Sequence, residues 1–224
     1  MPTLDVLYED NHLLLVNKEA GVLTQGDATG DVPLGELAKA YLKEKYQKPG
    51  AVFCGVVHRL DRPVSGVVAL AKTSKALERL SAAFRTRAVE KVYWALVARL
   101  PVPASGTLVH WLVKDERRNV VTAHPHEVPG SQRAELDYEV LREMGPYWLL
   151  EVRPLTGRPH QIRVQLAAGL RAPIAGDVKY GAARPLPDPR RIGLHARRLT
   201  VPHPTKPGET VTVEAPLPDA APWR

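Results

Sequence analysis

One short stretch of the chain gathers residue types that can do nucleophilic or acid–base chemistry. It covers residues 58–66 and contains one carboxylate, that of Asp61. Three potential cations lie beside it in the sequence: His58, Arg59 and Arg62. Nearby positive charge favours an ionised carboxyl group, which suits a nucleophile or a base better than a proton donor. The alternative interpretation is a surface ion pair inside a β-turn.

The flanking residues predict that this stretch is a stiff loop between two strands. Pro63 disfavours a helical conformation at Arg62, and Ser65-Gly66 allows a tight turn. The apolar segments 56–57 and 66–71 are typical of short strands. Catalytic groups often lie on loops of this kind.

Three helices are expected around these strands. Apolar residues recur at helical spacing over residues 34–46, and a second helix begins at Ser74, its expected N-cap. A third helix opens after Thr156-Gly157, with Pro159 in its first turn and Gly169 near its end.

Alternating apolar residues predict strands at residues 92–98, 134–140 and 148–152, and the apolar run 13–16 and the short segment 211–213 predict two more. Residues 119–131 are expected to form a loop, and residues 184–207 a proline- and arginine-rich tail. Strands outnumber helices, so the expected fold class is α+β, a mixed α/β arrangement built on a mixed or antiparallel sheet. Residues 101–105 are the candidate boundary between two halves.

Composition narrows the class of protein. Of 224 residues, 44% are hydrophobic and 25% charged, which excludes a disordered or fibrous chain. No apolar run approaches the roughly 20 residues of a membrane span, and the first residues lack the pattern of a signal peptide. Cys54 is the only cysteine, which excludes an internal disulfide and fits a reducing compartment. We therefore expect a cytoplasmic protein with no membrane partner.

The charge balance indicates a polyanionic partner. Lysine and arginine number 31 against 24 aspartates and glutamates, a formal net charge of +7. Basic surfaces bind nucleic acids by releasing counterions from phosphates. The histidines show no spacing typical of a metal site, so no metal is expected.

Several motifs, in order along the chain, resemble those of the RluA family of RNA pseudouridine synthases. They are His58-Arg59-Leu60-Asp61 with Ser65-Gly66, Lys91-Val92-Tyr93-Trp94-Ala95-Leu96-Val97, Thr156-Gly157-Arg158-Pro159-His160-Gln161-Ile162-Arg163, Gly176-Asp177-Val178-Lys179-Tyr180-Gly181 and Leu194-His195-Ala196. Two positions depart from the family pattern: Glu19 replaces the usual proline and Val64 the usual threonine. Both changes affect loops and leave Asp61 intact.

The resemblance implies a single catalytic domain, residues 1–224, with the pseudouridine synthase fold. This fold is a bisected, mainly antiparallel sheet flanked by helices and loops, in two halves with an RNA cleft crossing its middle. Many family members carry an additional N-terminal domain like that of ribosomal protein S4. The chain resembles the compact members without it, and we expect a monomer.

The resemblance also assigns an activity: isomerisation of uridine to pseudouridine in tRNA or ribosomal RNA, with no cofactor. The N-glycosidic bond breaks, the base rotates, and C5 is joined to the ribose. Asp61 corresponds to the catalytic aspartate, Tyr93 to a tyrosine that stacks on the uracil, and Arg163 to a basic residue that pairs with the aspartate. From its strand pattern alone, Tyr93 is equally a core residue.

RNA contacts are expected from five residues near these positions: His58, Arg59, Arg62, Arg158 and His160. The target uridine must be flipped out of its stack, and we expect Arg59 to fill the vacated space. A wider basic surface is expected from Arg85, Arg87, Lys91, Lys114, Arg117, Arg118, Arg190, Arg191, Arg197 and Arg198. Segments 114–131 and 184–206 are expected to select the RNA.

Two alternatives belong to other functional classes. A non-catalytic RNA-binding protein would use the same basic cleft. A glycoside or nucleoside hydrolase usually needs two carboxyl groups roughly 5–9 Å apart. Asp177 is the only other acid in a motif-like context.

Overall fold

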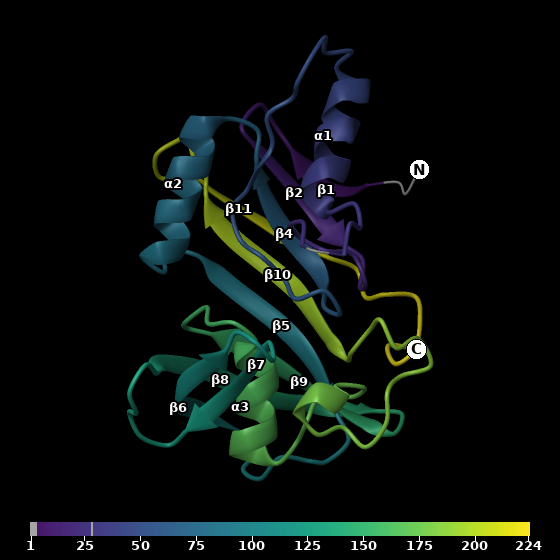
Figure 1. Cartoon of the computed structure of the whole chain (residues 1–224), viewed down its shortest axis with the longest axis vertical. Helices are drawn as coiled ribbons and strands as arrows, with labels where there is room; N and C mark the ends of the chain where they lie inside the picture. Colours follow the sequence, from purple (N-terminus) through teal and green to yellow (C-terminus); the bar gives the residue numbers. More distant parts are fainter. Residues whose placement is uncertain (1–3, 28) are drawn as a thin grey trace. The chain divides into compact units, whose positions relative to one another are not determined.

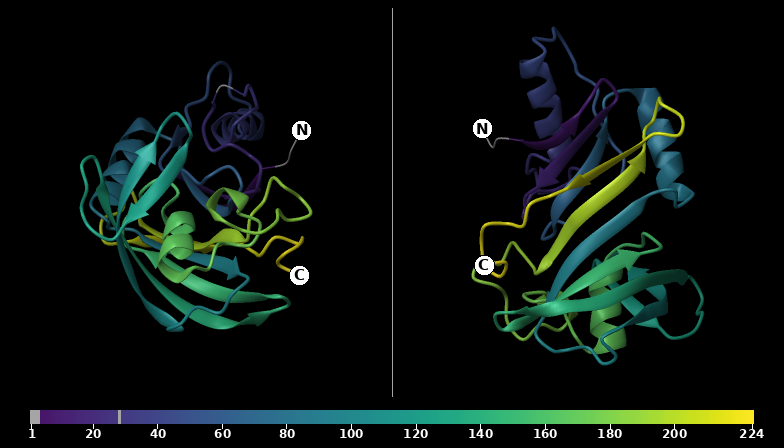
Figure 2. Two further views of the ribbon diagram at one scale, coloured as in Figure 1. Left: turned by 60° about the horizontal axis from the view of Figure 1, so that its bottom comes forward. Right: turned by 180° about the vertical axis from the view of Figure 1, so that it is seen from behind.

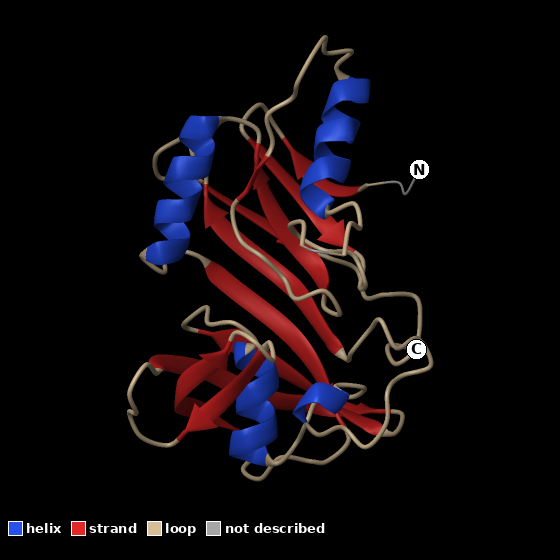
Figure 3. Cartoon of the chain, in the orientation of Figure 1, coloured by secondary structure: helices blue, strands red, loops and turns tan. Residues whose placement is uncertain are grey.

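The computed structural model describes residues 4–27 and 29–224, and its secondary structure confirms the expected α+β class (Figures 1 and 3). The described residues form eleven strands, three α-helices and one 3-10 helix, and the strand pairs are mainly antiparallel. In this part of the chain, no helix is long and apolar enough to cross a lipid bilayer.

The chain divides into two compact units. The first unit is built from the chain up to Lys91 together with Ala196–Leu217, and the second from Val92–His195 and Pro218–Arg224. Residues 101–105 lie inside the second unit, so the boundary expected there is wrong. The chain instead passes between the units after Lys91 and after His195, both within strands and without a linker signal in the composition, and a third time after Leu217.

The strands of the first unit follow the order β1 (Asp5–Glu9), β2 (Leu13–Lys18), β4 (Ser65–Ala71) and β10 (Leu194–Pro202). Two further strands pair with these, β3 (Gly55–Val56) with β4 and β11 (Thr210–Glu214) with β10. Every residue of β4 is buried, which explains its continuous apolar sequence. Residues 184–207 were expected to form a tail, but part of this segment is the strand β10.

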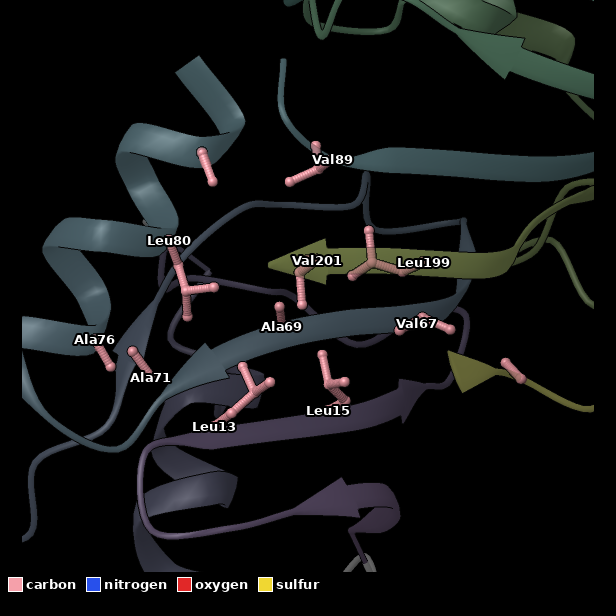
Figure 4. Close-up of a cluster of buried hydrophobic side chains, with 12 residues drawn as sticks. Leu13, Leu15, Val67, Ala69, Ala71, Ala76, Leu80, Val89, Leu199 and Val201 are labelled. Atoms are coloured by element: carbon pink, nitrogen blue, oxygen red, sulfur yellow. The ribbon is translucent and has the colours of Figure 1, made fainter. Parts of the chain in front are cut away.

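Two helices flank the sheet of the first unit, α1 (Leu34–Lys45) and α2 (Ser74–Arg85) (Figures 1 and 2). Both were expected, but the N-cap of α2 is Thr73 and not Ser74. The Thr73 hydroxyl accepts a hydrogen bond from the Ala76 amide at 3.2 Å. Leu80 of α2 packs into a core that also contains Leu13, Ala69 and Val201 (Figure 4).

The strands of the second unit follow the order β5 (Glu90–Val97), β9 (Tyr147–Pro154), β8 (Gln132–Met144), β6 (Ser105–Asp115) and β7 (Val120–His124). The expected loop over 119–131 is partly wrong because β7 forms a hairpin with β6. Asn119 takes a positive φ of 48° in the turn, and Val121 is buried. Val120-Val121 was therefore a strand signal that the prolines after it obscured.

A third helix, α3 (Gln161–Leu170), packs near β6 and β7 of the second unit, and the 3-10 helix η1 (Val178–Tyr180) follows it. Pro159 was expected in the first turn of this helix. The helix instead begins two residues after it, at Gln161. The N-cap of the helix is His160, whose backbone is left-handed with φ 51° and therefore not helical.

Candidate active site

Asp61 lies on the loop between β3 and β4, as its flanking residues predict. The loop backbone is held from both sides of this residue. The Thr24 hydroxyl donates to the Leu60 carbonyl at 2.9 Å and accepts from the Leu60 amide at 3.2 Å. The Val64 amide donates to the carbonyl of Asp61 at 3.0 Å and closes a turn. Asp61 itself is half-buried.

A buried ammonium group supports the same loop. Lys18, at the end of β2, is completely buried, and its Nζ donates to the carbonyls of Glu19 at 2.9 Å, Val22 at 2.8 Å and Arg62 at 3.3 Å. Burial lowers the pKa of Lys18 to about 7, and the negative charge of Asp61 opposes that shift. Lys18 thus links the turn after β2 to the residue that follows Asp61.

The imidazole of His58 makes contacts inside the first unit. Its Nε2 accepts a hydrogen bond from the Ala69 amide at 3.0 Å, and its ring stacks on Phe84 with centroids 4.5 Å apart. Burial and the positive charge of Lys91 lower the pKa of His58 to about 3. A ring that accepts at Nε2 is neutral, so His58 anchors the start of the loop to β4 and α2 at neutral pH.

The two arginines of the loop differ in their surroundings. Arg62 donates from Nε to the Gly21 carbonyl at 3.0 Å and forms an ion pair with Asp31. Both arginines are exposed to solvent. Arg62 is the one whose side chain is held against other parts of the protein by these contacts.

The loop ends at Gly66, the second residue of β4, which only glycine can occupy. Its φ is 115°, and a Cβ atom there would lie 2.3 Å from the carbonyl oxygen of Ala196 on β10. Gly66 thus fixes where the loop leaves the sheet.

Tyr93 lies on β5 in the second unit, opposite Val152 of β9, and is half-buried. Asp61 belongs to the first unit and both Tyr93 and Arg163 to the second. The expected stacking role of Tyr93 and the expected pairing of Arg163 with Asp61 therefore stay predictions.

Arg163 is held by a buried ion pair on the second unit. Its Nε and Nη2 donate to the two carboxylate oxygens of Asp177 at 2.7 and 2.8 Å, and both side chains are almost fully buried. The Tyr180 ring lies against the guanidinium, with its centroid 5.1 Å from Cζ. This bidentate geometry fixes the plane of the guanidinium. Asp177 was the only candidate for the second acid of a hydrolase. Its carboxylate is instead occupied by the buried ion pair with Arg163.

The hydroxyl of Tyr180 connects this pair to His160 and β7. It accepts a hydrogen bond from the Val121 amide at 3.0 Å and lies 2.6 Å from His160 Nδ1. Because the amide can only donate, the hydroxyl oxygen is the acceptor of that bond, and the hydroxyl can itself donate to Nδ1. His160 and Arg163 thus both contact residues of the 176–181 motif.

The segment before α3 is organised by Gln161. Its Oε1 accepts from the Thr156 hydroxyl at 2.7 Å and the Arg158 amide at 3.0 Å, and its Nε2 donates to the Glu135 carbonyl at 3.0 Å. Arg158 also donates from Nε to the Arg133 carbonyl at 3.2 Å. The expected phosphate contact of Arg158 is untested.

Sequence reasoning missed four residues that support the candidate site: Lys18, Thr24, Asp177 and Tyr180. The last two lie in a quoted motif, but nothing in their spacing indicated Arg163 as a partner. Lys18 carried one signal, a lysine at the end of an apolar strand. Thr24 carried none.

Comparisons with known proteins show which family the chain belongs to. The family model described as RNA pseudouridylate synthase matches residues 12–168. The chain therefore belongs to the RNA pseudouridine synthase family, whose members are isomerases that act on RNA, and the resemblance to RluA-type enzymes is confirmed.

Among curated relatives, an uncharacterized RNA pseudouridine synthase of Chlorobaculum parvum is 35% identical, with 96% of this chain and 71% of the relative covered. A ribosomal large subunit pseudouridine synthase C of Vibrio parahaemolyticus is 32% identical, with 95% and 65% covered. A ribosomal large subunit pseudouridine synthase D of Neisseria meningitidis is 36% identical, with 96% and 59% covered. The chain thus spans roughly three fifths to seven tenths of these relatives.

Solved structures also match in fold. The human RNA pseudouridylate synthase domain containing 4 has a TM-score of 0.79 and 26% identity, with 96% of this chain and 89% of that chain covered. The expected pseudouridine synthase fold is confirmed.

Proposed function

We propose that this protein converts uridine to pseudouridine in RNA, with Asp61 as the catalytic carboxylate. The observation that carries the proposal is the bracing of the Asp61 loop. Thr24 binds the backbone on one side of Asp61, and Lys18 binds it on the other. A carboxylate whose backbone is fixed at both neighbours loses little freedom when a substrate binds, which favours catalysis by positioning.

The charges around the loop suit an ionised carboxylate acting on a polyanion. The buried Lys18 amino group donates to the loop at the Arg62 carbonyl, Asp61 favours its protonated form, and Arg59 is exposed on the loop. His58 stays neutral, so we propose that it acts as a support and that Arg59 is the loop residue that enters the RNA stack. The bidentate ion pair with Asp177 fixes the orientation of Arg163. Its pairing with Asp61 is proposed from the family resemblance alone.

We propose ribosomal large-subunit RNA as the substrate class, since relatives over 30% identical carry that name. Transfer RNA is the alternative. In either case the target uridine must leave its stack, at a cost of a few kcal/mol. The formal charge of +7 supports binding to RNA, and the single cysteine supports a reducing compartment such as the cytoplasm. We also propose that the protein acts as a monomer and without a metal.

The first test is pseudouridine formation on total RNA from a strain that lacks the gene. Purified wild-type protein is expected to form pseudouridine at defined positions, mapped by sequencing. Asp61→Asn keeps the size of the side chain and should reduce the rate by at least about a thousandfold, because no carboxylate remains.

Glu78→Gln provides the matched control, since it neutralises an exposed carboxylate on α2, away from the Asp61 loop and the residues that support it. It should keep wild-type activity. If wild-type protein binds the RNA but forms no pseudouridine, the chain is a non-catalytic RNA-binding protein and the proposal is wrong.

A further inference from the structure

A group of lysines and tyrosines lies at the C-terminal end of α1, outside the Asp61 loop. We define it as the Tyr46 patch, made of Tyr41, Lys45, Tyr46, Lys48 and Lys72. All five residues belong to the first unit. They come from α1, from the segment that joins α1 to β3, and from the residue directly after β4 (Figure 1).

The carboxylate of Glu9 on β1 anchors the patch. It accepts hydrogen bonds from Lys45 Nζ at 2.7 Å, Lys72 Nζ at 2.7 Å, the Tyr41 hydroxyl at 2.8 Å and the Tyr46 hydroxyl at 2.7 Å. Burial raises the pKa of Glu9, but these bonds outweigh burial and lower the pKa to about 2. Four donors on one carboxylate fix the position of the patch before any ligand binds.

The ring of Tyr46 is accessible and surrounded by ammonium groups. Tyr46 is 45% exposed. The Nζ atoms of Lys72, Lys48 and Lys45 lie 4.8, 5.6 and 5.7 Å from the ring centroid. Proteins that bind single-stranded nucleic acids combine an aromatic ring, on which a base stacks, with cations that contact the backbone.

The charges of the patch are not balanced within the protein. Three lysines and one glutamate leave a net charge of +2 around the Tyr46 ring. Among the residues that the structure describes, no carboxylate pairs with Lys48, and Lys48 is exposed. A second aromatic side chain, Phe53, is 46% exposed just before β3, which pairs with the end of β4 that leads into Lys72. The net positive charge and the exposed Lys48 beside the Tyr46 ring favour a polyanion with stacking groups over a purely acidic surface.

We propose that the Tyr46 patch is a second RNA-binding surface, which holds a single-stranded part of the substrate outside the uridine pocket. A base stacks on Tyr46, and the adjoining phosphates contact Lys45 and Lys48. The proposal rests on the proposed function, because it assigns this surface to the same RNA substrate.

Binding of a short fluorescein-labelled single-stranded RNA, followed by anisotropy over a range of salt concentrations, tests the patch directly. Lys48→Gln should weaken binding and reduce the slope of log affinity against log salt by about 0.7, the value for one lost phosphate contact on a single strand. Tyr46→Ala should weaken binding by about fivefold or more, because a stacked base is lost. Tyr46→Phe keeps the ring and should stay close to wild type.

Arg142→Gln is the matched control, since it removes an exposed charge on β8 outside the patch. It should keep the wild-type affinity and salt slope. Wild-type affinity and salt slope in Lys48→Gln would overturn the proposal even if Tyr46→Ala failed to fold. If Lys48→Gln lost the wild-type protein's binding to vesicles of anionic phospholipid but kept its binding to RNA, the patch would be a membrane-binding surface and the proposal would be wrong. Pseudouridine formation by the wild-type protein is measured separately, so failure of the proposed function is distinguished from failure of the patch.

Discussion

At the scale of single residues, the environment of Asp61 is set largely by side chains that do not themselves do chemistry. The Thr24 hydroxyl makes both of its hydrogen bonds to Leu60, the residue before Asp61. Thr24 is buried, so no water replaces these bonds when the hydroxyl is lost. The position of Asp61 is therefore sensitive to a substitution thirty-seven positions earlier in the chain.

Thr24→Val tests this dependence, because valine matches threonine in shape but lacks the hydroxyl. Two unsatisfied backbone groups should lower the free energy of unfolding by about 1–3 kcal/mol. Because Asp61 loses its fixed position, kcat should fall more than KM changes. Chemical denaturation and steady-state pseudouridine formation measure both effects.

Thr24→Ser keeps the hydroxyl and should recover most of the kcat, because the serine hydroxyl can again bond the Leu60 amide and carbonyl. Equal kcat values for Thr24→Val and the wild type would show that the Thr24 contact does not position Asp61.

At the scale of elements, the start of β4 depends on the close approach of β10. Gly66→Ala should lower the free energy of unfolding by more than about 3 kcal/mol, because the new Cβ meets the Ala196 carbonyl and the left-handed φ disfavours alanine. Gly208→Ala is the comparison, since Gly208 has φ 81° but no neighbour within 4 Å of its added Cβ. It should cost only about 1 kcal/mol. Thermal unfolding of both variants measures the difference, and equal costs would contradict the close approach.

Most elements could be predicted from the sequence because their signals are local. Residues 34–46 and 66–71 show their periodicity or their apolar run within a single element, and α1 and β4 form there. The strand β10 was missed because its basic residues, Arg197 and Arg198, resemble those of the surrounding tail. Arg197 pairs with Glu214 on β11, a partner that no local pattern indicates.

In the candidate site, too, residues with a local sequence signal could be predicted and residues that depend on distant partners could not. Asp61 stands out because its loop is punctuated by proline and glycine. The pair of Arg163 and Asp177 does not, since fourteen residues and the end of α3 separate them. Similarly, the chain gives no local reason for Lys18 to bind the Arg62 carbonyl, forty-four residues away. Contacts of this kind follow from the completed fold and were outside the reach of pattern analysis.

At the scale of the molecule, acid stability should depend on Glu9, which ties β1 to α1 and to the end of β4. Its pKa lies near 2 in the folded protein, below its ordinary value of about 4.5. A lowered carboxyl pKa stabilises the folded state above pH 4.5, and this contribution is lost as the pH falls towards 2. We expect it to be about 2 kcal/mol.

Glu9→Gln should therefore unfold more easily than the wild type at pH 6, and the difference should shrink as the pH approaches 2. Urea denaturation at a series of pH values measures it. Glu44→Gln alters an exposed carboxylate at the end of α1 and should leave the pH dependence unchanged. A constant difference between Glu9→Gln and the wild type at every pH would contradict this role.

The passage of the chain from one unit to the other and back has a consequence for synthesis on the ribosome. Residues 92–195 emerge as one uninterrupted segment, so nearly all of the second unit is available to fold without waiting for later residues. The first unit is divided, and the edge of β4 that pairs with β10 stays open until residues 196–202 have been made. A nascent chain therefore carries an exposed apolar strand for more than a hundred codons, and a stop codon within that interval would leave a product prone to aggregation.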